Sequence, residues 1–181
     1  YVCMQPKAPY ATEFIDHPGT DLRVWLWQTW QHQVTGILIW ETVYWSSPTI
    51  YGDRLQNPYD DAASWSDMGT GPKTFRYNWG NGDGRFLYPP RNCFGADGAV
   101  SSSRPVLEAP NGTMRLEILR DGIEDYEYFA MLKRLDPSSS LLKVPADVYS
   151  SLTSYAEDSV SMERHRLLLA REIERQTRRG E

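Results

Sequence analysis

Residues 36–45 read GILIWETVYW, an apolar run that changes abruptly into aromatic side chains around one carboxylate. The run has no period-two alternation and is rich in β-branched residues, which is typical of a strand covered on both faces. Such strands belong to α/β folds, which place their ligand sites at the carboxyl ends of the strands. We therefore expect Trp40, Glu41, Tyr44 and Trp45 to lie together at the end of a buried strand.

Aromatic rings beside an acid suit the binding of a sugar. Indole and phenol rings offer a flat apolar surface for the C–H face of the sugar, and a carboxylate accepts hydrogen bonds from its hydroxyls. The same aromatic residues also fit an ordinary packed core, because buried tryptophan is common. From the residues alone, both interpretations stay open.

The composition is that of an ordinary globular chain of 181 residues, 40% of them hydrophobic and 24% charged. A net charge of −5 and scattered basic residues argue against a nucleic-acid surface. No stretch approaches the roughly 18 apolar residues of a membrane span. Cys3 and Cys93 lack the spacing of metal ligands and fit either unpaired thiols or one disulfide, and no motif indicates a metal or a cofactor.

The positions of glycine and proline and the hydrophobic periodicity predict the order of the secondary-structure elements. We expect strands over residues 1–4, 36–45 and 84–88, a long loop over 46–77, an irregular segment over 141–161, and helices over 22–33, 114–135 and 162–178. Thr20 or Asp21 is expected to cap the first helix. This order predicts a parallel α/β fold with right-handed crossovers. Because three strands are too few for a closed sheet, we expect an open edge that upstream sequence, a partner or self-association covers.

The helix expected over residues 114–135 carries an apolar stripe and many charges. Its stripe is formed by Leu116, Leu119, Ile123, Tyr126 and Ala130. The charges alternate in sign at spacings that suit ion pairs, which favours a scaffold over an active site. Gly122 costs about 1 kcal/mol relative to alanine inside a helix, so its presence indicates close backbone packing.

Four motifs occur in a fixed order along the chain. They are Phe14-Ile15-Asp16-x-Pro18-Gly19-x-x-x-Arg23, Gly36-Ile37-Leu38-x-Trp40 with Trp45, Gly82-Asp83-Gly84 leading to Tyr88-Pro89, and Arg115-Leu116-Glu117-x-x-Arg120-Asp121-Gly122-Ile123-Glu124-Asp125-Tyr126-Glu127-Tyr128. In order and spacing over residues 1–135, this series resembles the C-terminal part of the glycoside hydrolase family 123 catalytic domain.

The resemblance implies a (β/α)8 TIM barrel, of which this chain holds the last two to three βα units and a C-terminal helix. Residues 1–140 would be the C-terminal portion of the barrel, and residues 141–181 an irregular segment and a terminal helix that packs on it. The implied activity is the hydrolysis of β-linked N-acetylhexosamine, N-acetylgalactosamine above all, with retention of configuration. The acetamido oxygen of the substrate itself attacks the anomeric carbon. No cofactor is implied, and a secreted or periplasmic location would suit the family.

The family carries its catalytic residues as an adjacent Asp-Glu pair on an earlier strand of the barrel. The aspartate orients the acetamide and the glutamate serves as general acid and base. No Asp-Glu dipeptide occurs in this chain, and the reversed pairs Glu124-Asp125 and Glu157-Asp158 do not imitate it. We therefore expect no catalytic residue here and no turnover by this segment alone.

The expected contribution of this segment is substrate binding. The residues assigned to it are Trp40, Glu41, Tyr44, Trp45 and Tyr88. The alternative is a non-catalytic carbohydrate-binding or structural module that has aromatic residues without acid catalysis.

Overall fold

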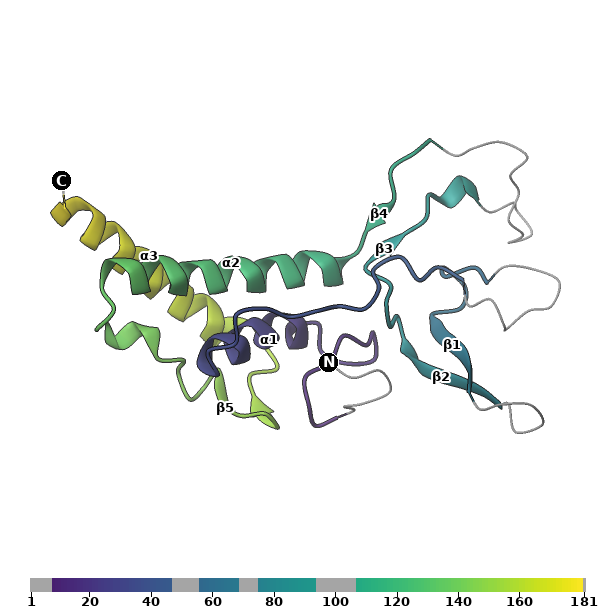
Figure 1. Cartoon of the computed structure of the whole chain (residues 1–181), viewed down its shortest axis with the longest axis horizontal. Helices are drawn as coiled ribbons and strands as arrows, with labels where there is room; N and C mark the ends of the chain where they lie inside the picture. The colour runs from purple at the N-terminus through teal and green to yellow at the C-terminus, as the bar shows by residue number, and fades with distance from the viewer. Residues whose placement is uncertain (1–7, 47–55, 69–74, 94–106, 181) are drawn as a thin grey trace. The chain divides into compact units, whose positions relative to one another are not determined.

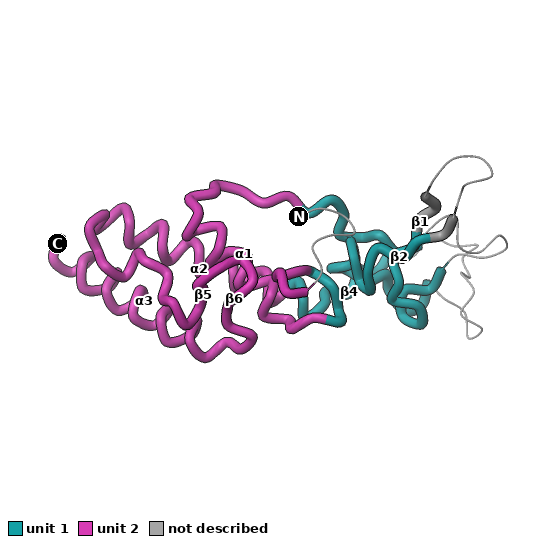
Figure 2. The backbone as a smooth tube through the Cα atoms, turned by 90° about the horizontal axis from the view of Figure 1, so that it is seen from below, with its two compact units in different colours: residues 1–5, 13–16, 39–116 teal, residues 6–12, 17–38, 117–181 magenta. Residues whose placement is uncertain are grey.

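The computed structural model describes residues 8–46, 56–68, 75–93 and 107–180, and these form two compact units (Figure 2). Unit 1 holds Glu13–Asp16 and the described part of Ile39–Leu116. Unit 2 holds residues 8–12, His17–Leu38 and the described part of Glu117–Glu181. The strand expected over residues 1–4 and the thiol of Cys3 lie outside the described residues.

Unit 2 is helical (Figure 1). The helices expected from the sequence are confirmed as α1 (Thr20–Gln31), α2 (Met114–Leu135, whose first turn belongs to unit 1) and α3 (Val160–Gly180). The cap expected for α1 is wrong, because the helix begins after Gly19 and no side chain caps it. The Asp21 carboxylate instead accepts the backbone N–H of Thr12 at 3.0 Å, so it serves the entering chain and not the helix end.

The segment expected to be irregular contains short elements: a 3₁₀ turn η3 (Ser140–Leu142) and a hairpin of β5 (Tyr149–Ser151) and β6 (Ser154–Tyr155). Together with α1, α2 and α3 it encloses the hydrophobic core of unit 2. The buried core residues are Ala11, Val24, Trp27, Phe129, Leu132, Val144, Val148, Tyr149, Met162 and Leu169.

Helices α1 and α2 lie close together at Gly122. A Cβ atom at this position would lie 3.1 Å from the Cα atom and 3.2 Å from the carbonyl oxygen of Arg23. Backbone atoms cannot swing aside as a side-chain end can, so any larger residue would have to push the two helices slightly apart. The close packing expected from the sequence is confirmed.

A buried ion-pair network joins the first and last sequence motifs. The Asp125 carboxylate, 1% exposed, accepts from Arg23 Nε at 2.6 Å and Nη2 at 3.1 Å, and from Trp27 Nε1 at 2.8 Å. Arg166 of α3 lies 3.2 Å from the same carboxylate, and Arg23 also bonds Glu163. The charged motif of α2 is therefore a scaffold that holds three helices together, as its spacing indicated.

Unit 1 contains small antiparallel sheets. Strand β1 (Ala63–Met68) pairs with β2 (Phe75–Asn81), with Trp65 opposite Asn78, and β3 (Leu87–Tyr88) pairs with β4 (Asn111–Gly112). The mixed α/β class is confirmed. Within the described residues, however, every strand pair is antiparallel, and the loop expected over residues 46–77 contains β1 and the start of β2. Of the strand expected over residues 84–88, only Leu87–Tyr88 pairs as a named strand.

The buried strand expected over residues 36–45 is wrong. The run bends at Trp40 and Thr42 and belongs to no named strand, and an isolated bridge from Val43 to Arg85 is its ladder contact in the described part of the chain. Leu38 is 76% exposed and Ile37 43%. A strand needs neighbours that pair its N–H and C=O groups and cover its apolar side chains. Among the described residues, the backbone groups of the run are only partly paired and its apolar side chains are only partly covered.

Candidate functional site

Three aromatic residues of unit 1, Trp40, Tyr44 and Trp79, form a cluster. The ring centroid of Trp40 lies 5.1 Å from that of Tyr44 and 5.3 Å from that of Trp79. The Trp40 indole is fixed by a 2.8 Å hydrogen bond from its Nε1 to Asp83. Gly84 has a φ of +70°, and a Cβ atom there would lie 2.9 Å from Trp40. The cluster therefore depends on a glycine that combines a left-handed backbone with a missing side chain.

The backbone around the aromatic cluster is held by the buried guanidinium of Arg85. Its Nε donates to the Tyr44 carbonyl at 2.6 Å and its Nη1 to the Asp61 carbonyl at 2.8 Å. Its Nη2 donates to the Gln56 side chain and the Ala63 carbonyl, each at 2.9 Å. Burial lowers the pKa of Arg85. Four bonds to fixed oxygens offset this cost and make the centre of unit 1 polar.

A second arginine, Arg115 of the last motif, bonds the glycine-rich third motif and the residue that precedes the first motif. Its Nη1 donates to the carbonyls of Glu13 at 2.6 Å and Gly82 at 3.0 Å, and its Nη2 bonds the carbonyl of Arg85. Burial lowers the pKa of Arg115 as well. Because its bonds go to backbone oxygens, the motif arginine acts by fixing the loop of residues 80–85, on which the aromatic cluster packs.

Trp45 and Tyr88 lie at β3. Trp45 is part-buried, and its indole Nε1 donates to the Leu87 carbonyl at 2.8 Å. The Tyr88 ring lies 5.2 Å from the ring of Tyr59, whose hydroxyl donates to the Pro89 carbonyl at 2.6 Å. The structure therefore brings the expected aromatic residues into two groups. One holds Trp40 and Tyr44, and the other lies at β3, where Trp45 bonds the Leu87 carbonyl and Tyr88 contacts Tyr59.

Glu41 lies in the turn that joins these groups. Its Oε1 accepts the backbone N–H groups of Thr42 at 2.9 Å and Val43 at 3.1 Å. One carboxylate oxygen is thus used to shape the turn. This arrangement suits a positioning and acceptor role better than proton transfer, because a general acid must carry its proton toward the substrate.

Trp79 and Tyr59 were not predicted as site residues. For Trp79 a signal was present, because aromatic and polar residues alternate through FRYNW at residues 75–79, a period typical of a strand. Its indole Nε1 is buried and has no hydrogen-bond partner among the described residues. Tyr59 carries no such signal, since its ring contact with Tyr88 depends on the tertiary fold.

Two features are absent from the residues that the structure describes. No group of three or more His, Cys, Asp or Glu side chains there is placed to hold a metal ion. No helix there is both long and apolar enough to cross a membrane.

Residues 1–132 match the model of a glycoside hydrolase family, described as glycoside hydrolase 123, catalytic domain. The match covers most of the chain and includes all of the aromatic residues of the candidate site. The chain therefore belongs to the glycoside hydrolase 123 catalytic-domain family, as its four motifs indicated. A comparison with curated proteins finds no match.

Proposed function

We propose that this chain is the closing part of a (β/α)8 glycosidase domain that hydrolyses β-linked N-acetylhexosamine, of the N-acetylgalactosamine type. In this proposal the segment binds the sugar, and an Asp-Glu pair outside it transfers the protons. Residues 1–140 belong to the barrel, and residues 141–181 pack on it. The observation that carries the proposal is the family match over residues 1–132 in a chain without an Asp-Glu dipeptide.

The exposed apolar run supports the barrel part of this proposal. Ile37, Leu38 and Val43 are 43%, 76% and 41% exposed, although their sequence pattern is that of a buried strand. Burial of an aliphatic side chain is worth about 1.5–3 kcal/mol, so covering these three would stabilise an assembled domain substantially. We assign the cover to an upstream part of the same protein, with a second copy of the chain as the alternative.

The proposed reaction is a substrate-assisted retaining hydrolysis. The acetamido oxygen attacks the anomeric carbon while the glutamate outside this chain protonates the departing glycosidic oxygen. A cyclic intermediate forms and the glycosidic bond breaks. Water, deprotonated by the same glutamate, then attacks the anomeric carbon and reopens the ring. Throughout, Trp40, Tyr44 and Trp45 hold the sugar face, and Glu41 accepts a hydroxyl hydrogen bond.

Turnover of an aryl N-acetyl-β-galactosaminide tests whether this segment binds the sugar while residues outside it transfer the protons. We expect no hydrolysis by the purified 181-residue chain and clear hydrolysis by a longer polypeptide that also carries the upstream strands. Hydrolysis by the chain alone would place the acid within it. A longer polypeptide that folds, binds sugar and does not hydrolyse the substrate would support the non-catalytic module instead.

Binding of N-acetylgalactosamine to the longer polypeptide tests the aromatic residues. We expect the sugar to change tryptophan fluorescence and Trp45→Ala to abolish most of that response. Trp25→Phe is the matched control, because Trp25 lies in unit 2, where its indole bonds the Ala11 carbonyl. If Trp45→Ala and Trp25→Phe leave the same response, Trp45 belongs to the core and not to the sugar site.

A further inference from the structure

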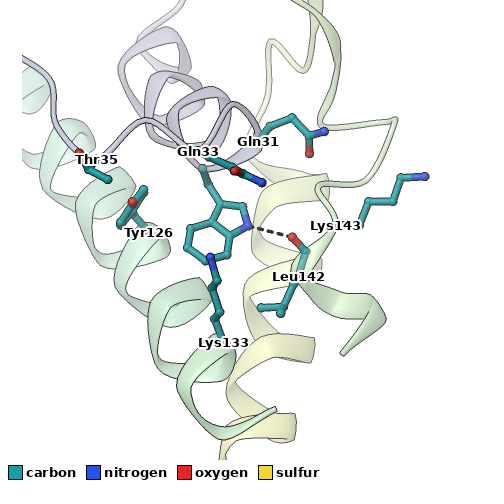
Figure 3. A pocket seen from close by; sticks show the side chains of 8 residues that line it. Gln31, Gln33, Thr35, Tyr126, Lys133, Leu142 and Lys143 are labelled. Atoms are coloured by element: carbon teal, nitrogen blue, oxygen red, sulfur yellow. Dashed lines mark hydrogen bonds between the residues drawn. The ribbon is translucent and has the colours of Figure 1, made fainter. Parts of the chain in front are cut away.

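Unit 2 contains a pocket of about 420 Å³ that the proposed function does not use (Figure 3). It lies where the end of α1, the middle of α2 and η3 meet, and its lining includes Trp30, Gln33, Tyr126, Lys133 and Lys143. Its volume falls in the range of about 300–1,000 Å³ that is typical of small-molecule sites. We propose that this pocket binds a sugar that carries an anionic group, a sulfate ester or a carboxylate.

The apolar part of the pocket is the indole of Trp30. Phe129 stacks on one face, with centroids 5.0 Å apart and planes 17° from parallel, and Trp30 Nε1 donates to the Leu142 carbonyl at 2.8 Å. The ring is thus fixed from behind and at its edge. Because Phe129 covers one face, the Lys133 ammonium, 5.5 Å from the ring centroid, lies over the other. Tyr126 contacts the indole edge-on, with ring centroids 5.4 Å apart. A pyranose would take the place of the Lys133 ammonium over this second face, with its C–H face on the ring.

The charge of the pocket is positive. None of its eight lining residues is acidic. The chain has four lysines, and both of those that lie in the described residues, Lys133 and Lys143, line this pocket. In Figure 3 the Lys133 side chain rises from α2 into the pocket, whereas Lys143 extends to one side, at the rim. An anion would give Lys133 a charged hydrogen-bond acceptor, which is a stronger partner than an aromatic face.

Gln33 supplies a second, independent observation. Its φ is +57°, and its N–H bonds the Trp30 carbonyl at 3.0 Å while the N–H of Val34 bonds the Thr29 carbonyl at 2.9 Å. This is the Schellman end of α1, at a position where glycine is usual because a Cβ atom is strained there. This chain has glutamine instead, and the residue lines the pocket. Strained residues of this kind mark functional positions, and an amide suits the hydroxyls of a sugar.

The pocket lies in unit 2 and the aromatic residues of the proposed glycosidase site lie in unit 1, so this inference does not rest on the proposed function. In the bound state the indole contacts the sugar ring, the Gln33 amide bonds its hydroxyls, and Lys133 pairs with the anionic group. No bond to the ligand is made or broken.

The proposal is tested by titrating the full chain with four probes and measuring binding by calorimetry and by tryptophan fluorescence. The probes are N-acetylgalactosamine 6-sulfate, glucuronic acid, neutral N-acetylgalactosamine and sodium sulfate. We expect at least one anionic sugar to bind, and which of the two binds identifies the anionic group. Equal binding of the neutral sugar overturns the role of charge, and equal binding of sodium sulfate reduces the pocket to a simple anion site, which also overturns the proposal.

Two variants and one control locate the binding. Lys133→Gln is expected to weaken binding of the anionic sugar about tenfold, the worth of one charge-assisted hydrogen bond. Arg134→Gln removes the same charge from the next residue of α2, which is exposed like Lys133 but is not part of the lining, and this variant is expected to bind normally. Gln33→Gly is expected to weaken binding several-fold without destabilising the chain. If Lys133→Gln and Arg134→Gln bind alike, the ligand lies elsewhere.

Discussion

Replacement of Asp125 by asparagine should destabilise unit 2 more than any single loss of surface charge. The variant keeps the size and shape of the side chain and removes its charge. In the native chain the carboxylate is 1% exposed and receives hydrogen bonds from Arg23 and Trp27, with Arg166 close by. Burial alone would lower the pKa of Arg23, but the hydrogen bonds and charges of Asp125 and Glu163 outweigh burial and raise it.

The expected loss in the free energy of unfolding follows from the buried charge of Arg23 that remains in the variant. Breaking a buried ion pair by removing one partner costs about 3–5 kcal/mol, since the remaining charge stays buried without compensation. Arg23 retains Glu163, which is 52% exposed, so we expect the lower end of that range, about 3 kcal/mol. Total stabilities of about 5–15 kcal/mol make this a large fraction. With a denaturant slope of about 2 kcal/mol per molar, the urea midpoint should fall by about 1.5 M.

Urea unfolding of the full chain, followed by far-ultraviolet circular dichroism, measures this shift. The matched control is Glu124→Gln, the same change of charge on the neighbouring residue of α2. Glu124 also pairs with Arg166, at 2.6 Å, but its side chain is 41% exposed. Exposed ion pairs contribute little, so its midpoint should hardly move. Equal shifts for the two variants would refute the reasoning that burial, and not charge pairing as such, gives Asp125 its importance.

Two further predictions concern the same helices. Gly122→Ala should lower the free energy of unfolding by about 1 kcal/mol in the same assay. Crowding against the backbone of Arg23 costs about 1–3 kcal/mol, which outweighs the roughly 1 kcal/mol that alanine adds to helix propensity. A more stable variant would show that the helices can move apart. Burial lowers the pKa of His165 from its ordinary value of 6.5, so the native state binds fewer protons than the unfolded state, and stability should be lost as the pH falls from 6.5 through the native pKa. His165→Gln should flatten the dependence of the urea midpoint on pH between pH 7 and 5, and an unchanged slope would contradict this assignment.

The helices could be predicted from the sequence because their signals are local. Helix α2 has the bounds expected from the turn before it and the proline after it. Its buried face was predicted only in part. Leu119 is buried as expected, but Ile123 is 47% exposed, and the positions that face the core include Gly122 and Asp125. Apolar periodicity does not mark a glycine or a carboxylate as a core residue. Gly122 is buried by the close contact with α1, and Asp125 is buried because it pairs with Arg23, 102 residues away.

The role of the expected aromatic residues in sugar binding stays a prediction, but part of their grouping could be read from the sequence. Trp40 and Tyr44 do share one cluster, and the glycine-rich turn that follows them in sequence is the surface against which they pack. The supports of this cluster could not be predicted, because Arg85 holds it through bonds to backbone carbonyls. Such bonds have no sequence signature, since any residue supplies a carbonyl.

The error over residues 36–45 and the polar centre of unit 1 have one physical origin. A hydrophobic pattern records how much burial a segment is adapted to, not which partner provides it. In this chain the run that is adapted to burial keeps Leu38 largely exposed, while the buried positions of unit 1 include Arg85, which an apolar core does not contain. Under the proposed function, further polypeptide supplies the apolar contacts that residues 36–45 lack. Addition of that polypeptide should reduce the exposure of the run and extend the Val43–Arg85 bridge into a ladder, which hydrogen exchange at residues 36–45 measures. Unchanged, fast exchange in the longer polypeptide would contradict this explanation.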